Sequence, residues 1–167
     1  WFVNPETGVE FPNRGHWSTI GDFGHGDIKL IWEPSRFQWL VLAAQGYATT
    51  EGNDYLVLIN RWLSDWSEKN PLNQGTNWKC AQETAIRLMN LLTAALFLGD
   101  YQQPTPGLVQ MVREHCQRIY PTLHYAIAQD NNHGTSEFAA LFIAGSWLKM
   151  VDQETAESKQ WLQRGRS

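Results

Sequence analysis

The sequence is as informative in what it lacks as in what it contains. No hydrophobic run approaches the length needed to cross a bilayer, and no basic segment precedes an apolar one as in a secretion signal. Neither a glycine-rich phosphate loop nor a GxSxG motif occurs. Charged residues are 18% and hydrophobic ones 43% of 167 residues, which excludes a disordered tail or a coiled coil. We expect one domain with a substantial core and no membrane insertion.

Cysteine is scarce. Cys80 and Cys116 show no CxxC or Cys/His spacing of a metal site, and each lies within a helical pattern. Two buried free thiols are therefore expected. A single disulfide stays open if the protein is exported.

Positive charge is also limited. The formal net charge is −4, with no basic stripe to neutralise phosphates, so we expect no nucleic-acid partner. A few lysines and arginines can still line a cleft for an acidic substrate. The first residue is Trp1 and not Met, so the chain looks processed or excised, and the missing targeting segment says nothing about its compartment.

Helical periodicity covers most of the chain, and no segment alternates as a strand does. A first helix can begin at Pro34, and a second follows the turn at 49–52 with Tyr55, Ile59, Trp62 and Trp66 on its buried face. Later helices are expected at about 78–98, at 108–129 with a break at Pro121, from Phe138 to Leu148, and at 154–162. The residues in register on the 78–98 helix are Ala81, Ala85, Leu88, Leu92 and Ala95. Those on the 108–129 helix are Val112, Cys116, Ile119, Leu123 and Ile127.

The expected fold is all-α, built from antiparallel helical hairpins. Residues 1–31 form an extended arm held to the body by Trp1, Phe2, Phe11, Trp17 and Phe23, and residues 32–167 form the helical domain. Nine tryptophans are many for this length. Tryptophan commonly packs on sugar rings, but it is also large core filling, which is the more frequent role.

Connection order predicts a one-sided polar surface. If successive helices alternate in direction, the entry to the first helix, the 70–77 loop and the 130–136 loop share one rim of the stack. The opposite rim carries ordinary turn residues. The polar and aromatic residues expected on the first rim are Asp27, Lys29, Trp32, Glu33, Arg36, Asn70, Asn73, Gln74, Asn77, Trp78, Asn131, Asn132 and His133.

The run Asp130-Asn131-Asn132-His133-Gly134-Thr135-Ser136-Glu137 is the strongest candidate for a site on this rim. Amide plus imidazole suits a site that holds an anionic group and moves a proton beside it. A turn whose Asn and Asp side chains satisfy their own backbone is the alternative. A metal site at His133 and Glu137 lacks a third ligand, so no metal is expected.

Two further motifs support that rim. Lys29 or Arg36 can face an anion with Trp32 as a wall, although Glu33 at a helix start and local salt bridges explain the same residues. Asn77 and Trp78 can bind a polar ring by hydrogen bonding and stacking. Glu83 and Arg87, four residues apart, form either a surface pair or a partly buried pair that orients the loop; Glu33, Glu83 and Glu137 are alternative acids for hydrolysis.

At these residues the sequence resembles the heparinase II/III-like family of polysaccharide lyases, over most of the chain up to about Met150. The matching pieces are Asn4-Pro5-x-Thr7-Gly8, Asp27-x-Lys29-x-x-Trp32-Glu33-x-x-Arg36, Asp65-Trp66 before Asn70-Pro71, Gly75-x-Asn77-Trp78, Glu83-x-x-x-Arg87, and Asn131-Asn132-His133 with Glu137.

The resemblance implies a bacterial, periplasmic or extracellular enzyme with an (α/α) toroid followed by a β-sandwich, and no cofactor. Such enzymes cleave uronate-containing anionic polysaccharides by β-elimination. It implies that Asn132 neutralises the substrate carboxylate with His133 as its catalytic neighbour. Substrate-binding roles then fall to Asn77, Trp78, Lys29, Arg36, Arg87 and Asn131, and supporting roles to Glu83, Glu137, Trp32 and Glu33.

The chain also departs from the family. The family's catalytic Tyr and a further His come later than residue 167, and Tyr120 and Tyr125 match neither. We therefore expect an amino-terminal part of a longer protein, nearly inactive alone, whose partners include the rest of its own chain. A non-catalytic glycan-binding module and a glycoside hydrolase on a helical barrel are the alternatives.

Overall fold

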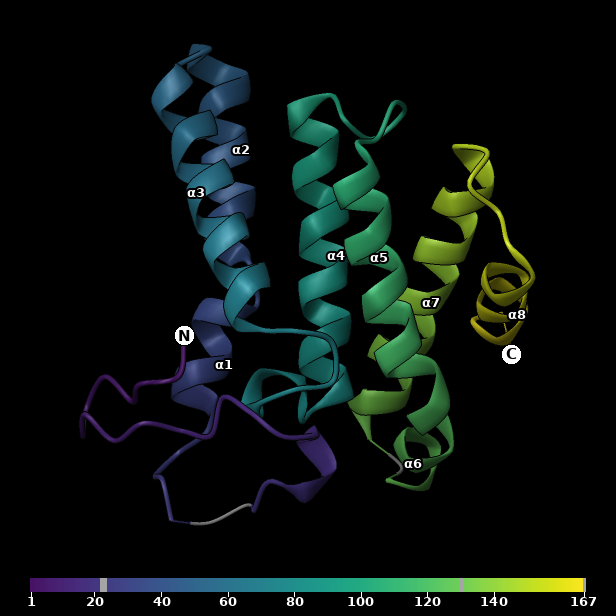
Figure 1. Ribbon diagram of the computed structural model, residues 1–167. Coiled ribbons are helices and arrows are strands. Elements are labelled where there is room, and N and C mark those ends of the chain that lie inside the picture. Colours follow the sequence, from purple (N-terminus) through teal and green to yellow (C-terminus); the bar gives the residue numbers. More distant parts are fainter. Residues whose placement is uncertain (22–23, 130, 167) are drawn as a thin grey trace.

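The computed structural model describes residues 1–21, 24–129 and 131–166 and is helical throughout its body (Figure 1). No β-strand forms within these ranges; the arm contributes two isolated bridges. This confirms the predicted all-α class. The helices are α1 (Lys29–Ser35), α2 (Gln38–Thr50), α3 (Asn53–Lys69), α4 (Ala81–Leu98), α5 (Pro106–Ile119), α6 (Leu123–Ala128), α7 (Asn132–Met150) and α8 (Ala156–Arg164), with short 3-10 turns at Trp17–Thr19, Thr76–Trp78 and Tyr120–Thr122.

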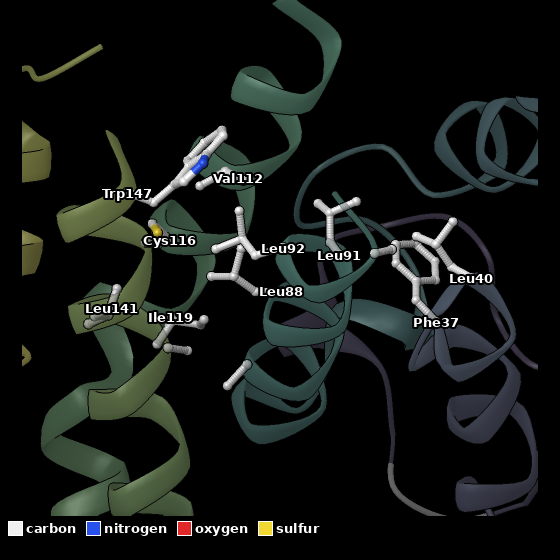
Figure 2. Packing of buried hydrophobic residues seen from close by; sticks show 14 of the residues in the cluster. Phe37, Leu40, Leu88, Leu91, Leu92, Val112, Cys116, Ile119, Leu141 and Trp147 are labelled. Carbon is white, nitrogen blue, oxygen red and sulfur yellow. The ribbon is translucent and has the colours of Figure 1, made fainter. Parts of the chain in front are cut away.

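Three antiparallel hairpins, α2–α3, α4–α5 and α7–α8, stand side by side (Figure 1). Helix α4 is central, because it packs against α2, α5 and α7. Figure 2 shows Leu91 on the side of α4 facing Phe37 and Leu40, while Leu88 and Leu92 face the side chains of α5 and α7. Full burial of one such leucine contributes about 2 kcal/mol.

The sequence pattern of α4 explains its central position. The five residues expected on its buried face are all buried, namely Ala81, Ala85, Leu88, Leu92 and Ala95. Small alanines let the neighbouring helices approach closely, and the leucines fill the space between them. The break expected at Pro121 is also confirmed, since α5 ends at Ile119 and α6 begins at Leu123.

The predicted start of the first helix, at Pro34, is wrong. Pro34 lies inside α1, which begins at Lys29, so the arm ends three residues earlier than expected. A new helix starts only after Phe37, whose backbone is left-handed with φ 63°. That conformation costs roughly 1–2 kcal/mol for a residue other than glycine. Burial of the Phe37 ring, edge-on against Trp66, offsets the cost.

Two residues expected on the buried face of α3, and one expected on that of α6, are outside the core. Ile59 and Trp66 of α3 are buried as predicted, but Tyr55 and Trp62 are 36% and 40% exposed. Ile127 of α6 is 52% exposed. The reason is that α3 lies at the edge of the stack and α6 at its end, so each has fewer neighbours to cover a second face (Figure 1).

The arm packs on the loop that precedes α4. Phe2 and Phe11 are buried, as expected, while Trp1 and Trp17 are half-buried; Phe23 lies outside the described residues. Backbone hydrogen bonds join Thr76 N–H to Pro12 O at 3.0 Å and Trp17 N–H to Asn73 O at 3.0 Å. The arm thereby fixes one end of the helical stack.

Cys116 is buried and Cys80 is half-buried. Both are free thiols, so they do not form the disulfide that the sequence left possible. No helix in the described ranges combines the length and the apolar character needed to span a membrane.

Gly145 sets the distance between α7 and α8. A Cβ atom there would lie 2.8 Å from Leu162 Cβ and 2.9 Å from Leu162 Cα. Gly145→Ala must therefore push α8 away from α7, and we expect the free energy of unfolding to fall by about 2 kcal/mol in urea titration.

Gly134→Ala is the matched control in the same helix. The nearest atom to its new Cβ is Ala126 O at 3.8 Å, an ordinary contact. We expect it to be neutral or to stabilise by up to about 1 kcal/mol. Equal unfolding midpoints for the two variants would show that close packing of α8 does not depend on Gly145.

Candidate functional site

The predicted polar rim forms one end of the helical stack. Helix α1, the loop into α4 and the start of α7 lie at the lower end in Figure 1, whereas the α2–α3 turn and the α4–α5 connection lie at the upper end. Gln82 Nε2 of α4 lies 3.5 Å from Ser136 Oγ of α7, which links two of these segments directly. The prediction that these segments share one end is confirmed, but Asn70, Asn77 and Trp78 of the predicted rim are buried and do not contribute to its surface.

Asn131 and Asn132 differ in their roles. Asn131 caps α7, because its Oδ1 accepts a 2.9 Å hydrogen bond from the His133 backbone N–H. The expectation of a connecting loop through Ser136 is wrong from Asn132 onward, since those residues form the first turns of α7; Asp130 lies outside the described residues. Helix capping therefore explains the Asn131 side chain, which is one of the residues predicted to bind substrate.

Asn132 is left free by this arrangement. Its side chain is exposed and has no hydrogen-bond partner among the residues that the structure describes. It stands in the first turn of a helix of 19 residues, where unpaired backbone N–H groups create a partial positive charge. An amide donor at that end of a helix is well placed to receive a carboxylate.

His133, which is half-buried, and Glu137, which is buried, lie side by side on α7. His133 Nδ1 lies 3.8 Å from Glu137 Oε1. Burial raises the pKa of Glu137 to about 7, although the Arg118 guanidinium acts in the opposite direction. The second oxygen of Glu137 is buried without a hydrogen-bond partner in the described part of the chain.

The raised pKa of Glu137 makes stability depend on pH. The folded protein holds this proton more tightly than the unfolded chain, whose glutamate has an ordinary pKa of 4.5. The stabilising contribution is therefore fully present below about pH 4.5 and is lost as the pH rises through about 7. Glu137→Gln keeps a neutral group, so at pH 8 we expect it to be more stable than the wild type by on the order of 2 kcal/mol.

The free energies of unfolding of Glu137→Gln and of the wild type must be compared at each pH. His115 is buried, which lowers its pKa well below the usual 6.5, so its contribution is lost as the pH falls below about 6.5. His115 acts equally in both proteins and cancels in the difference. Urea titrations from pH 5 to 8 measure that difference, and parallel curves would remove Glu137 as the source.

Arg36 is already paired. Its Nε donates to Glu83 Oε2 at 2.6 Å and its Nη2 donates to Glu83 Oε1 at 2.8 Å, while Glu33 lies 3.7 Å from Nη1. This two-point hydrogen bond raises the pKa of Arg36. The predicted Glu83–Arg87 pair is wrong, because the turn after α1 brings Arg36 to Glu83 instead. Arg36 is neutralised and is a weak candidate for binding an anion.

Arg87 lies inside the protein and not at the rim. It is 1% exposed, and burial lowers its pKa to about 9. Its Nε donates to His115 Nε2 at 2.9 Å, and its two terminal nitrogens donate to Ser35 O at 3.2 Å and Asn77 O at 3.3 Å. Because His115 Nε2 accepts, Nδ1 carries the proton and donates to Met111 O at 2.6 Å. Direct contact of Arg87 with a substrate is excluded in this arrangement.

Aromatic rings surround that guanidinium. Its central carbon lies 4.6 Å from the Trp66 ring centre, 4.9 Å from Trp78 and 5.9 Å from Phe37. Cation–π attraction of a desolvated arginine can reach about 2 kcal/mol. The box of three rings and three acceptors holds α1, α4 and α5 together beneath the rim.

Asn77 and Trp78 belong to the same interior layer. Both side chains have no exposed surface. Asn77 Nδ2 donates to Asn70 Oδ1 at 3.0 Å, and Trp78 Nε1 donates to Asn70 O at 3.1 Å. The predicted stacking of a sugar ring on Trp78 is wrong, and so is direct hydrogen bonding by Asn77, since the loop turns both side chains inward.

The remaining rim residues lie around α1. Lys29 is exposed and forms no ion pair within the described ranges. Trp32 is half-buried, with its indole N–H donating to Thr76 O at 3.0 Å, and the Glu33 side chain is 66% exposed. Lys29 is thus a free cation at the same end of the stack as Asn132.

Sequence reasoning missed Arg118 and His115. Arg118 Nε donates to Trp78 O at 2.6 Å, and its guanidinium lies 3.8 Å from the Trp17 ring centre. Burial lowers its pKa to about 10. A usable signal was their position: both fall within the helical spacing of the buried residues Val112, Cys116 and Ile119.

Comparisons of this chain with protein-family models, curated proteins and solved structures found no match. Within the described ranges, no group of three or more His, Cys, Asp and Glu side chains is arranged to hold a metal ion. The chemistry available at the rim is therefore an exposed amide, an imidazole beside a buried carboxyl group, and a free lysine.

Proposed function

We propose that this chain is part of a polysaccharide lyase that cleaves uronate-containing anionic glycans by β-elimination. The observation that carries the proposal is the exposed Asn132 amide at the positive end of α7, next to His133. The Asn132 side-chain N–H donates to the substrate carboxylate. This stabilises the negative charge that develops when the neighbouring carbon loses its proton.

The reaction has two coupled changes. A base removes the proton from the carbon next to the carboxylate; the C–H electrons form a carbon–carbon double bond, and the bond to the glycosidic oxygen breaks. That oxygen takes up a proton as it departs. His133 is the titratable side chain adjacent to Asn132, and its Nδ1 faces Glu137, so its Nε2 is the nitrogen available for proton transfer.

The order of the helices supports the toroid part of the proposal. Helices α2, α4 and α7 form one continuous row, while their partners α3 and α5 lie on the other side. A cavity of about 670 Å³ lies between α3 and α5, lined by Leu63 and Met111 among others, and the two helices meet where Ser67 Oγ lies 4.0 Å from Met111 Sδ. A stack that is tight in one row and open in the other curves toward the tight row. Further hairpins, a β-sandwich and a bacterial periplasmic or extracellular location belong to the same proposal.

A non-catalytic glycan-binding module is the second candidate. It is favoured by the state of the arginines, since Arg36 is neutralised by Glu83 and Arg87 is buried. Few free cations remain at the rim for a highly charged polymer. A glycoside hydrolase using Glu33, Glu83 and Glu137 is less well supported, because Glu83 is bound to Arg36.

Product analysis of the full-length gene product tests these alternatives. Heparan sulfate and alginate are supplied separately, and ultraviolet absorbance reports the unsaturated sugar that elimination creates. We expect absorbance to rise with at least one polymer. Chain shortening without absorbance would indicate hydrolysis, and binding without shortening would indicate the glycan-binding module; either result overturns the lyase.

A further inference from the structure

Three tryptophans form a row on the outside of the α2–α3 hairpin. Trp62 of α3 is 40% exposed, and its ring centre lies 5.0 Å from that of Trp39 at the start of α2. Trp39 lies in turn 6.3 Å from Trp1 of the arm. We call Trp1, Trp39 and Trp62 the tryptophan row. It lies away from Asn132 and His133, because α4 stands between this hairpin and α7 (Figure 1).

Hydrogen bonds hold two of the three indoles of the row in place, those of Trp1 and Trp39. Trp1 Nε1 donates to Asp65 Oδ2 at 2.6 Å, and Trp39 Nε1 donates to Pro34 O at 3.1 Å. Asp65 also pairs with Lys69 at 2.6 Å, and these two contacts lower its pKa and keep it ionised. The Trp62 indole N–H has no partner among the described residues. Fixed rings lose little conformational freedom on binding, which favours affinity.

A polar cleft continues the row at Trp1. It has a volume of about 660 Å³ and lies between the arm and the end of α3. Trp1 forms part of its wall, and its charged and amide side chains include Glu10, Arg14, Glu68, Lys69 and Gln74. We call it the arm cleft. Arg14 and Glu68 form no ion pair in the described part of the chain, so both are available to a ligand.

We propose that the tryptophan row and the arm cleft form one binding site for an oligosaccharide, separate from Asn132 and His133. Pyranose rings offer flat C–H faces, which pack on indoles, and hydroxyl edges, which need donors and acceptors of both kinds. Trp62 supplies such a surface, since it is 40% exposed and its plane is turned 70° from that of Trp39. The arm cleft supplies carboxylates, amides and cations together, a mixture that suits hydroxyl groups more than a ligand of one charge.

The chemistry distinguishes this surface from the cavity between α3 and α5. That cavity is lined mainly by aliphatic side chains such as Leu56, Leu63 and Leu108, which offer little to hydroxyl groups. A second contact with the same polymer would raise the local concentration of glycan at the rim. Binding at the row does not require that the rim cleaves anything, so the two proposals can fail separately.

The test is binding of defined oligosaccharides to the purified chain. Hexasaccharides of alginate, of heparan sulfate and of neutral cellulose are titrated while indole N–H signals are followed by NMR. We expect at least one of them to shift the signals of the tryptophan row. Trp62→Ala should weaken that binding roughly tenfold. Loss of one stacked ring costs about 1.4 kcal/mol, which corresponds to a factor of ten in affinity.

Tyr125→Ala is the matched control, since Tyr125 is 61% exposed on α6, away from the row. It should leave the affinity unchanged. Absence of binding by the wild type, or equal affinity of Trp62→Ala, overturns the proposal. Concentration-dependent association of the chain that Trp62→Ala abolishes would also overturn it, in favour of contact between copies.

Discussion

Arg87→Met is expected to lower the free energy of unfolding by about 4 kcal/mol. The substitution leaves three buried acceptors without their donor, namely His115 Nε2, Ser35 O and Asn77 O. Each unsatisfied buried group costs about 1–3 kcal/mol. The cation–π contacts with Trp66 and Trp78 are lost as well. Methionine fills part of the volume, which offsets only the packing loss.

Arg87→Lys tests the geometry of that site separately from its charge. A single ammonium group cannot reach three acceptors that the planar guanidinium serves at once. We therefore expect a loss intermediate between wild type and Arg87→Met. Urea titration with far-ultraviolet circular dichroism measures both variants.

Arg61→Met provides the control for removing an arginine. Arg61 is exposed on α3 and forms no ion pair in the described ranges. Its replacement should change the free energy of unfolding by less than about 0.5 kcal/mol. If Arg87→Met were as stable as Arg61→Met, the arginine box would not be a source of stability.

Asn132→Ala has the largest expected effect on activity. If Asn132 neutralises the substrate carboxylate, its removal deletes one donor to the charge that develops in the transition state. Loss of one such donor typically costs about 3 kcal/mol, or roughly a hundredfold in kcat. Initial rates of ultraviolet absorbance change with the full-length gene product measure this directly.

A change in protein stability should not account for the loss of activity in Asn132→Ala. The Asn132 side chain is exposed and makes no hydrogen bond in the described part of the chain, and alanine favours a helix more than asparagine does. Asn132→Asp should be at least as inactive, because a second carboxylate repels that of the substrate. Gln117→Ala removes an exposed amide from α5 and should keep full activity. Unchanged kcat in Asn132→Ala would exclude this residue from the mechanism.

Much of the helical architecture could be predicted because its causes are local. The apolar spacing in α4 predicted its buried face residue by residue, and Pro121 predicted the break after α5. Even the shared rim followed from local information, since alternating helices and short connections leave few ways to arrange the loops. The limit appeared at helix ends, where Phe37 and Asn132 depend on burial and capping that spacing does not encode.

The partners of the polar side chains could not be predicted in the same way. The spacing in the sequence predicts an ion pair between Glu83 and Arg87, and a Trp78 side chain on which a sugar ring can stack. In the folded protein Glu83 binds Arg36, and Trp78 and Arg87 form an interior layer with His115.

Periodicity and connection length thus defined which helices exist and at which end the polar residues collect. Only the packing of α1, α4 and α5 decided which of those residues face the solvent and which pair inside. The physical reason is range: a helical repeat acts over one or two turns, whereas a buried charge takes whichever partners distant segments bring within hydrogen-bonding distance.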